Sequence, residues 1–271
     1  MAETDRAERP VALITGGSSG IGKATARRLL ADGYDVAIAA RGEERLEEAR
    51  TELVEHGSGR VIAVPADVTK PDDVDRLVAE TLADPGRIDV LVNNAGRVGS
   101  VESFHDVDIE EWHRTFEVNV YGAVRMTRAV LPHMRERGSG SVINVASESG
   151  VQPDPIIAHY NATKAALINL TKTLSKAYGS DGIRVNAVSP AATLTPMLEG
   201  LLREAAAEKG VEFETAREEW LAEERSNVVL ERTSEPAEVA SVIAFLASDD
   251  ASFVTGANYR VDGGSVASID T

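Results

Sequence analysis

The sequence contains no cysteine, which excludes disulfides, thiolate metal ligands and cysteine nucleophiles. It has no run of about 18 consecutive apolar residues, so it predicts no membrane-spanning helix. Its five histidines (56, 105, 113, 133 and 159) show no metal-ligand spacing, and we expect no metal site. The first ten residues are polar and lack the apolar segment of a secretory signal. A cytoplasmic protein is therefore the expectation.

Basic residues are also scarce, with 28 Lys and Arg against 44 Asp and Glu, which gives a formal net charge of −16. Nucleic acid and anionic membranes repel such a chain, so neither is expected as a primary partner. Only 6 of the basic residues are lysine. An acidic, lysine-poor composition fits a salt-adapted host, but GC-rich coding would also favour arginine, and both explanations stay open.

Short apolar runs alternate with longer amphipathic segments along most of the 271 residues. This alternation predicts an α/β fold, a single Rossmann-like doubly wound domain over residues 1–271, with a seven-stranded parallel sheet and helices on both faces. The expected strands cover 11–15, 35–40, 61–64, 88–93, 141–146, 183–188 and 258–261. The expected helices cover 23–32, 43–56, 108–135, 157–178 and 236–248, with a further helix starting at Pro71 after Thr69 as its N-cap.

Residues 194–230 carry no strand pattern. They predict two helices, 198–209 and 214–225, separated by Gly210. An inserted helical pair in a parallel-sheet domain suggests a lid over a substrate site. A solvated helical hairpin that serves only packing is the alternative.

A glycine-rich loop, Thr15-Gly-Gly-Ser-Ser-Gly-Ile-Gly22, joins the first expected strand to the first helix. Its glycines permit a tight turn and close backbone approach. The following helix N-terminus offers unpaired N–H groups and a positive dipole end, which suit a phosphate. A purely structural turn is the alternative.

Five further motifs accompany this loop in order: Asn93-Asn-Ala-Gly96, Asn119 within Glu-Val-Asn-Val-Tyr-Gly, Ser147, Tyr160-Asn-Ala-Thr-Lys164, and the tail Val254-Thr-Gly … Val261-Asp-Gly-Gly264. With the spacing Gly-x-x-x-Gly-x-Gly in the loop, the chain resembles the short-chain dehydrogenase/reductase family over roughly residues 9–264. The resemblance implies an NAD(P)-dependent oxidoreductase acting on alcohols or ketones. It also implies the catalytic residues Asn119, Ser147, Tyr160 and Lys164.

The residue types agree with these roles. Tyr160 and Lys164 are four residues apart and would share a helix face. An ammonium about 4 Å from a phenol is worth up to ~4 kcal/mol at an effective dielectric of about 20, which would lower the pKa of Tyr160 by up to about three units. Such a phenol would transfer protons near neutral pH. Ser147 would donate a hydrogen bond to the substrate oxygen, and by resemblance Asn119 would hold a water that relays protons past Lys164.

The end of the second strand indicates which nicotinamide cofactor is bound. NAD enzymes usually place a carboxylate there for the ribose 2′-hydroxyl, whereas this chain has Ala40 followed by Arg41. An arginine binds a 2′-phosphate that a carboxylate would repel. We therefore expect NADP(H) rather than NAD(H), although Ser19 stands where many NADP-preferring relatives have a basic residue. Stacking of Arg41 on the adenine is the alternative role.

The resemblance also implies which other residues contact the cofactor. The expected set is Gly16, Ser18, Ser19, Gly20, Ile21, Gly22, Arg41, Asp67, Val68, Asn94, Ala95, Gly96, Tyr160, Lys164, Thr193 and Thr195. Ala191 stands where the family usually has glycine. Either the backbone there has an ordinary conformation or the loop on the nicotinamide side is repositioned.

The substrate would enter between residues 148–156 and the lid. An apolar set on the lid favours a medium-sized ketone, and a 3-oxoacyl thioester is one candidate, although the lid has no basic cluster for a carrier. That set is Leu194, Met197, Leu198, Leu201, Leu202, Phe213 and Trp220; packing of the lid on the domain is its alternative role. A sensor that binds NAD(P)(H) without turnover is the alternative function. By resemblance we expect a homotetramer and a small-molecule partner.

Overall fold

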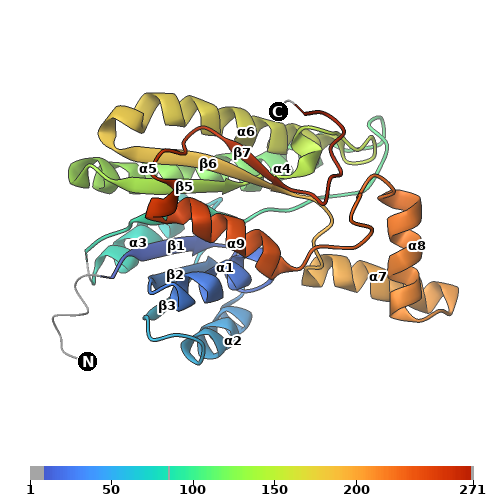
Figure 1. Ribbon diagram of the computed structural model, residues 1–271, viewed down its shortest axis with the longest axis horizontal. Helices are drawn as coiled ribbons and strands as arrows, with labels where there is room; N and C mark the ends of the chain where they lie inside the picture. The colour runs from blue at the N-terminus through green and yellow to red at the C-terminus, as the bar shows by residue number, and fades with distance from the viewer. Residues whose placement is uncertain (1–8, 85, 270–271) are drawn as a thin grey trace.

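The computed structural model describes residues 9–84 and 86–269, so residues 1–8, 85, 270 and 271 of the expected domain lie outside the described residues. Its strands form one seven-stranded sheet in the order β3-β2-β1-β4-β5-β6-β7 (Figure 1). Every neighbouring pair is parallel, which confirms the predicted sheet. The strands are β1 Val11–Thr15, β2 Asp35–Ala40, β3 Val61–Pro65, β4 Val90–Asn93, β5 Gly140–Val145, β6 Ile183–Pro190 and β7 Asn258–Val261.

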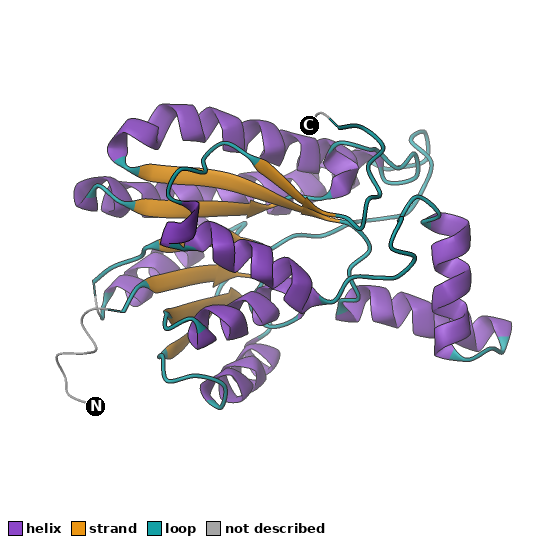
Figure 2. Cartoon of the chain, in the orientation of Figure 1, coloured by secondary structure: helices purple, strands orange, loops and turns teal. Residues whose placement is uncertain are grey.

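Helices cover both faces of the sheet because its strands are apolar on both sides (Figure 2). Ile14 faces the core formed with α1 (Gly20–Ala31), α2 (Glu43–Val54) and α9 (Pro236–Ala247). Its neighbour Leu13 faces the opposite core. The helices of that second core are α3 (Pro71–Leu82), α5 (Gly122–Arg137) and α6 (Ala158–Tyr178), and α4 (Ile109–Phe116) packs against α6. The doubly wound arrangement is therefore confirmed.

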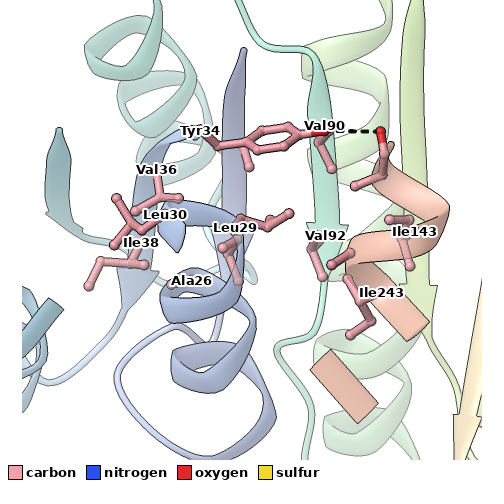
Figure 3. Packing of buried hydrophobic residues seen from close by; sticks show 14 of the residues in the cluster. Ala26, Leu29, Leu30, Tyr34, Val36, Ile38, Val90, Val92, Ile143 and Ile243 are labelled. Atoms are coloured by element: carbon pink, nitrogen blue, oxygen red, sulfur yellow. Dashed lines mark hydrogen bonds between the residues drawn. The ribbon is translucent and has the colours of Figure 1, made fainter. Parts of the chain in front are cut away.

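The first core packs α1 and α9 against the strands (Figure 3). Leu29 of α1 and Ile243 of α9 are both fully buried against the strands. The Tyr34 hydroxyl donates a hydrogen bond to the carbonyl of Ala247, 3.3 Å away, which ties the end of α9 to the start of β2. Since β1 pairs with both β2 and β4, the strand order reverses here, and such a reversal leaves a ligand crevice at the carboxyl ends of the strands.

The lid consists of α7 (Pro196–Lys209) and α8 (Phe213–Glu224), and it projects beyond the strand ends (Figure 1). Leu202 of α7 and Leu221 of α8 are buried, and the two helices pack mainly on each other. Met197 and Leu201 are 64% and 50% exposed. Part of the expected apolar set therefore faces solvent instead of packing on the sheet.

Two local predictions are wrong. The helix expected over 108–135 is interrupted by a π-helix, Glu117–Tyr121, between α4 and α5. The N-cap of α3 is Lys70 and not Thr69, because the Thr69 hydroxyl instead donates to the Asp67 carboxylate at 2.8 Å. Short 3-10 helices cover Glu148–Gly150, Gly179–Asp181 and Asp249–Ala251.

Across the described part of the chain, no helix has the length and apolar character needed to cross a bilayer. The same residues contain no group of three or more acidic or histidine side chains arranged to hold a metal ion.

Candidate active site

The glycine loop is packed so tightly that two of its residues must be glycine. A β-carbon at Gly22 would lie 2.3 Å from the Gly16 carbonyl oxygen and 2.6 Å from Asn94 Nδ2. Gly16 itself has a φ of +68°, in the left-handed region. The loop therefore makes the tight turn that the sequence predicts. Ser19 has an extended backbone, and α1 begins at the residue after it.

The N-terminus of α1 differs from those of the two helices that follow it. α2 and α3 each begin with a pair of carboxylates, Glu43 and Glu44 in one and Asp72 and Asp73 in the other, whereas the first turn of α1 has none. Carboxylates normally stabilise the positive end of a helix. Their absence at α1, together with the missing side chains of the glycines, leaves space and unneutralised N–H groups that fit a dinucleotide pyrophosphate. Ser18, Ser19 and Ile21 line this turn and are partly exposed.

Asn94 holds the glycine loop from the neighbouring strand. Its Nδ2 donates to the carbonyls of Thr15 and Gly16, at 2.9 and 3.2 Å. The backbone N–H groups of Asn94 and Ala95 both donate to the Thr15 hydroxyl at 3.0 Å. The Asn94 amide is thus engaged with the protein, and its contribution to cofactor binding is to fix the ends of β1 and β4.

The expected adenosine end lies where β2 and β3 end. Arg41 is exposed and forms no ion pair or hydrogen bond with any residue that the structure describes. Arg45, one helical turn later, lies near the same turn, with its guanidinium 3.8 Å from where a Gly42 β-carbon would be. Sequence reasoning missed Arg45, although its spacing of four residues from Arg41 was the signal. The Asp67 carboxylate is occupied by the N–H and hydroxyl of Thr69, and Val68 is buried.

Tyr160 and Lys164 lie on one face of α6 with the ammonium 5.4 Å from the centre of the phenol ring. The Lys164 side chain is 4% exposed, and its Nζ donates to the Val145 carbonyl at 2.8 Å. Burial lowers the pKa of Lys164 to about 8, because the charged form loses its hydration.

The expected lowering of the Tyr160 pKa is wrong for the protein alone. Burial raises the pKa of Tyr160, the Ser147 hydrogen bond opposes this increase, and the charge of Glu148 adds to it. The ammonium is directed at the Val145 carbonyl and does not offset the desolvation of the phenol. Tyr160 therefore holds its proton at neutral pH.

The π-helix positions Asn119, which is buried. Its Oδ1 accepts from the N–H of Arg97 at 2.8 Å, and its Nδ2 donates to the carbonyl of Arg97 at 2.9 Å and to the Thr163 hydroxyl at 3.0 Å. A β-carbon at Gly96 would lie 3.4 Å from Asn119 Oδ1 and 3.6 Å from Lys164 Nζ. The fold thus brings Asn119, Ser147, and the α6 residues Tyr160 and Lys164 to one place from three separate segments. Sequence reasoning missed the π-helix, whose apolar pattern does not differ from that of an α-helix.

The loop after β6 reaches over the glycine loop. A β-carbon at Gly20 would lie 3.2 Å from the Thr195 methyl group, which places Thr195 beside the start of α1. The Thr193 hydroxyl instead accepts a hydrogen bond from Ser234 at 2.9 Å and is buried. Ala191 has no positive φ, so the first of the two alternatives, an ordinary backbone conformation, applies.

A buried amide network under the site was also missed. Asn93 Nδ2 donates to Thr127 and Asn144, and Asn144 Nδ2 donates to Thr171. It ties the ends of β4 and β5 to α5 and α6, which carry or adjoin the residues predicted to be catalytic.

Comparison with known proteins identifies the family. A family model described as enoyl-(acyl carrier protein) reductase matches residues 16–266. The chain is 38% identical to meso-2,3-butanediol dehydrogenase of Serratia marcescens, with 97% of each chain covered. It is similar to the structure of L-sorbose reductase from Gluconobacter frateurii complexed with NADPH and L-sorbose, with 37% identity, a TM-score of 0.91 and coverage of 96% and 98%.

A third relative is the structure of 3-ketoacyl-(acyl-carrier-protein) reductase from Brucella melitensis complexed with NADH, at 35% identity and a TM-score of 0.83, with coverage of 96% and 99%. These relatives share one fold and a nicotinamide cofactor or a dehydrogenase activity, while their substrates differ. The chain belongs to the short-chain dehydrogenase/reductase family of NAD(P)-dependent oxidoreductases.

Proposed function

We propose that this protein is an NADP(H)-dependent carbonyl reductase that interconverts a ketone and a secondary alcohol, with Tyr160 as the general acid and base. The observation that carries the proposal is the convergence of Tyr160, Ser147 and Lys164 beside the ends of β4 and β5. When bound, the nicotinamide supplies or accepts the hydride.

The residues of the chain supply the proton transfer. Ser147 and Tyr160 are hydrogen-bonded to each other, so both hydroxyls can contact one substrate oxygen. The raised pKa of Tyr160 keeps its proton in place until charge develops on that oxygen, which suits reduction of a carbonyl. Lys164, with a pKa of about 8, can exchange protons near neutral pH, and its Nζ and the Asn119 Oδ1 both lie beside Gly96, where the resemblance places the relaying water.

Replacing Tyr160 with phenylalanine tests this function. The variant Tyr160→Phe keeps the ring but removes the proton donor, so we expect kcat for NADPH oxidation to fall at least about 100-fold. Cofactor affinity, measured by fluorescence titration, should change little. Turnover at the wild-type rate would contradict the mechanism, and an inert wild type that still binds NADPH would favour the sensor.

Arg41 supports the preference for NADP(H), because its guanidinium is exposed and free of ion pairs within the described residues, where a 2′-phosphate would be held. We expect Arg41→Ala to lower the ratio of kcat/KM for NADPH to that for NADH by about 10- to 100-fold. Arg50→Ala is the matched control, because Arg50 lies on α2 and pairs with Glu47. A wild type that prefers NADH, or a ratio that Arg41→Ala leaves unchanged, would remove the assignment.

The assembly and location that we propose are a homotetramer in the cytoplasm. Phe253 is fully exposed and Phe245 of α9 is 38% exposed, so apolar surface is available for association near the end of α9. Light scattering that gives the mass of a single chain would contradict the tetramer.

A further inference from the structure

A buried carboxyl group, that of Glu148, lies beside the catalytic residues with one oxygen unsatisfied. Glu148 follows Ser147 directly and is 8% exposed. Glu148 begins the 3-10 helix that packs on α6, which carries Tyr160, and its charge raises the pKa of the Tyr160 phenol. Its Oε2 is buried and has no hydrogen-bond partner within the described residues. Leaving such an atom unpaired is costly, which points to a ligand that completes it.

The rest of the carboxyl group is fixed by protein contacts. The Ser265 hydroxyl lies beside the Glu148 carboxyl group, where hydrogen bonding to it opposes the increase that burial causes in the pKa of Glu148. Ser265 Oγ in turn accepts from Asn227 Nδ2 at 2.5 Å, so its own proton is directed at Glu148. Asn227 therefore orients Ser265, and Ser265 orients the carboxyl group.

Ser265 is itself held from two sides. The Asp262 carboxylate accepts from the N–H groups of Gly264 and Val266, both at 3.1 Å, and so shapes the turn after β7. Gln152 donates to the Ser265 carbonyl at 3.3 Å. The chain after Ser147, the segment after α8 and the turn after β7 thus converge on this one carboxyl group.

The chemistry of Oε2 selects the ligand. Burial raises the pKa of Glu148, the Ser265 hydrogen bond and the charge of Arg225 oppose this, and the charges of Asp262 and Asp154 add to it. A hydroxyl satisfies Oε2 in either protonation state, because it donates to a carboxylate and accepts from a carboxylic acid. A carbonyl can only accept a hydrogen bond, so it satisfies Oε2 only in the carboxylic acid. An ammonium can only donate, so it satisfies Oε2 only in the carboxylate.

We propose that Glu148 binds a hydroxyl group next to the reacting carbon, so that the substrate is an α-hydroxyketone and its reduction product a vicinal diol. In this reduction a hydride adds to the carbonyl carbon, the Tyr160 proton goes to the carbonyl oxygen, and the neighbouring hydroxyl stays on Glu148. The inference rests on the proposed reductase function and names its substrate class. It replaces the plain apolar ketone that the lid residues suggest.

The test compares substrate pairs that differ only in the hydroxyl: 3-hydroxybutan-2-one against butan-2-one, and 2-hydroxycyclohexanone against cyclohexanone. For the wild type with NADPH we expect kcat/KM to be at least tenfold higher for each hydroxyketone. In Glu148→Met the ratio of kcat/KM within each pair should fall to about one, whatever the change in the absolute rates, and Glu148→Gln should retain most of the preference. Glu208→Met, which changes an exposed lid carboxylate, is the control.

Ser265→Ala gives a second variant in case Glu148→Met folds poorly, and we expect a preference reduced about threefold because the carboxyl group is no longer oriented. Equal rates for the two members of each pair, or a preference that survives Glu148→Met, would overturn the inference but leave the reductase function intact. If no ketone is reduced, the reductase function fails. Calorimetric binding of the same pairs to the NADP⁺ complex then decides the inference, with equal affinities counting against it.

Discussion

The cofactor side and the substrate side of the active site are built in different ways. On the cofactor side, Gly16 and Gly22 pack so closely against Asn94 that a side chain at either position would have no room. On the substrate side, α7 and α8 pack mainly on each other and leave Met197 and Leu201 exposed. The proposed cofactor side is thus tightly packed, whereas the proposed substrate side is loosely packed and partly exposed.

Substitutions of two helical glycines, one on each side of the site, test this comparison with the largest expected effects. We expect Gly22→Ala to weaken NADPH binding at least about 100-fold and to destabilise the fold by roughly 1–3 kcal/mol, because the new methyl group meets backbone that cannot move aside. Gly200→Ala in α7, where nothing lies within 4 Å of the added carbon, should instead stabilise the protein by about 0.5–1 kcal/mol. Cofactor titration and thermal melting check both variants. Normal NADPH binding by Gly22→Ala would show that the cofactor side is not tightly packed.

Lys164 gives a second test of the comparison. It is a functional group on the cofactor side, and its burial lowers the stability of the protein. We expect Lys164→Met to lower kcat at least about 100-fold and yet to stabilise the protein alone, by up to about 3 kcal/mol at pH 7, since the buried ammonium is removed. The folded pKa of about 8 lies below the ordinary value of 10.5, so the unfolded chain binds more protons between these values. The contribution of Lys164 to the free energy of unfolding therefore rises with pH across this window.

Denaturant melts at several pH values check this expectation. In Lys164→Met, the free energy of unfolding should lack the increase with pH that Lys164 causes in the wild type. Lys176→Met, at an exposed position of the same helix, is the control. A Lys164→Met variant that is less stable than the wild type at pH 7 would contradict the assignment of Lys164 as a strained functional group.

The smallest effect is expected on the substrate side, at the ion pair between Arg225 and Asp154, 3.3 Å apart, which links the end of α8 to the chain after Ser147. Arg225→Gln should raise KM about two- to fivefold with little change in NADPH affinity, because a partly exposed pair is worth under about 1 kcal/mol. The difference should shrink in high salt. Arg203→Gln, which breaks a pair inside α7, serves as control. A larger effect of Arg203→Gln on KM would argue against a link between lid and loop.

The sequence predicts the packed side well and the polar side poorly, for a physical reason. Buried strands such as β1 and β2 need continuous apolar runs, and the glycines at 16 and 22 are required by steric contact, so both leave clear signals. The Glu148–Ser265–Asn227 chain joins residues far apart in sequence, and no local spacing announces it. The predicted Thr69 cap failed for a similar reason, because Asp67 competes for the same hydroxyl.

The prediction that Lys164 lowers the pKa of Tyr160 failed for a different reason. The spacing of Tyr160 and Lys164 indicates their mutual attraction but not their burial, and desolvation is the larger effect on the pKa of each group. Sequence identifies which charges are neighbours on a helix. It does not show how much water each one loses.

The π-helix at Glu117–Tyr121 has an evolutionary consequence. A wide turn of this kind arises when one residue is inserted into an ordinary helix without rotating the turns on either side. Deleting Val118 should therefore restore a continuous α-helix and leave the positions of α4 and α5 unchanged. Asn119 would then lose its hydrogen bonds to the backbone of Arg97. The extra residue of the π-helix therefore sets the position of Asn119. We expect ancestral or engineered chains that lack this residue to fold stably but to have no catalytic activity.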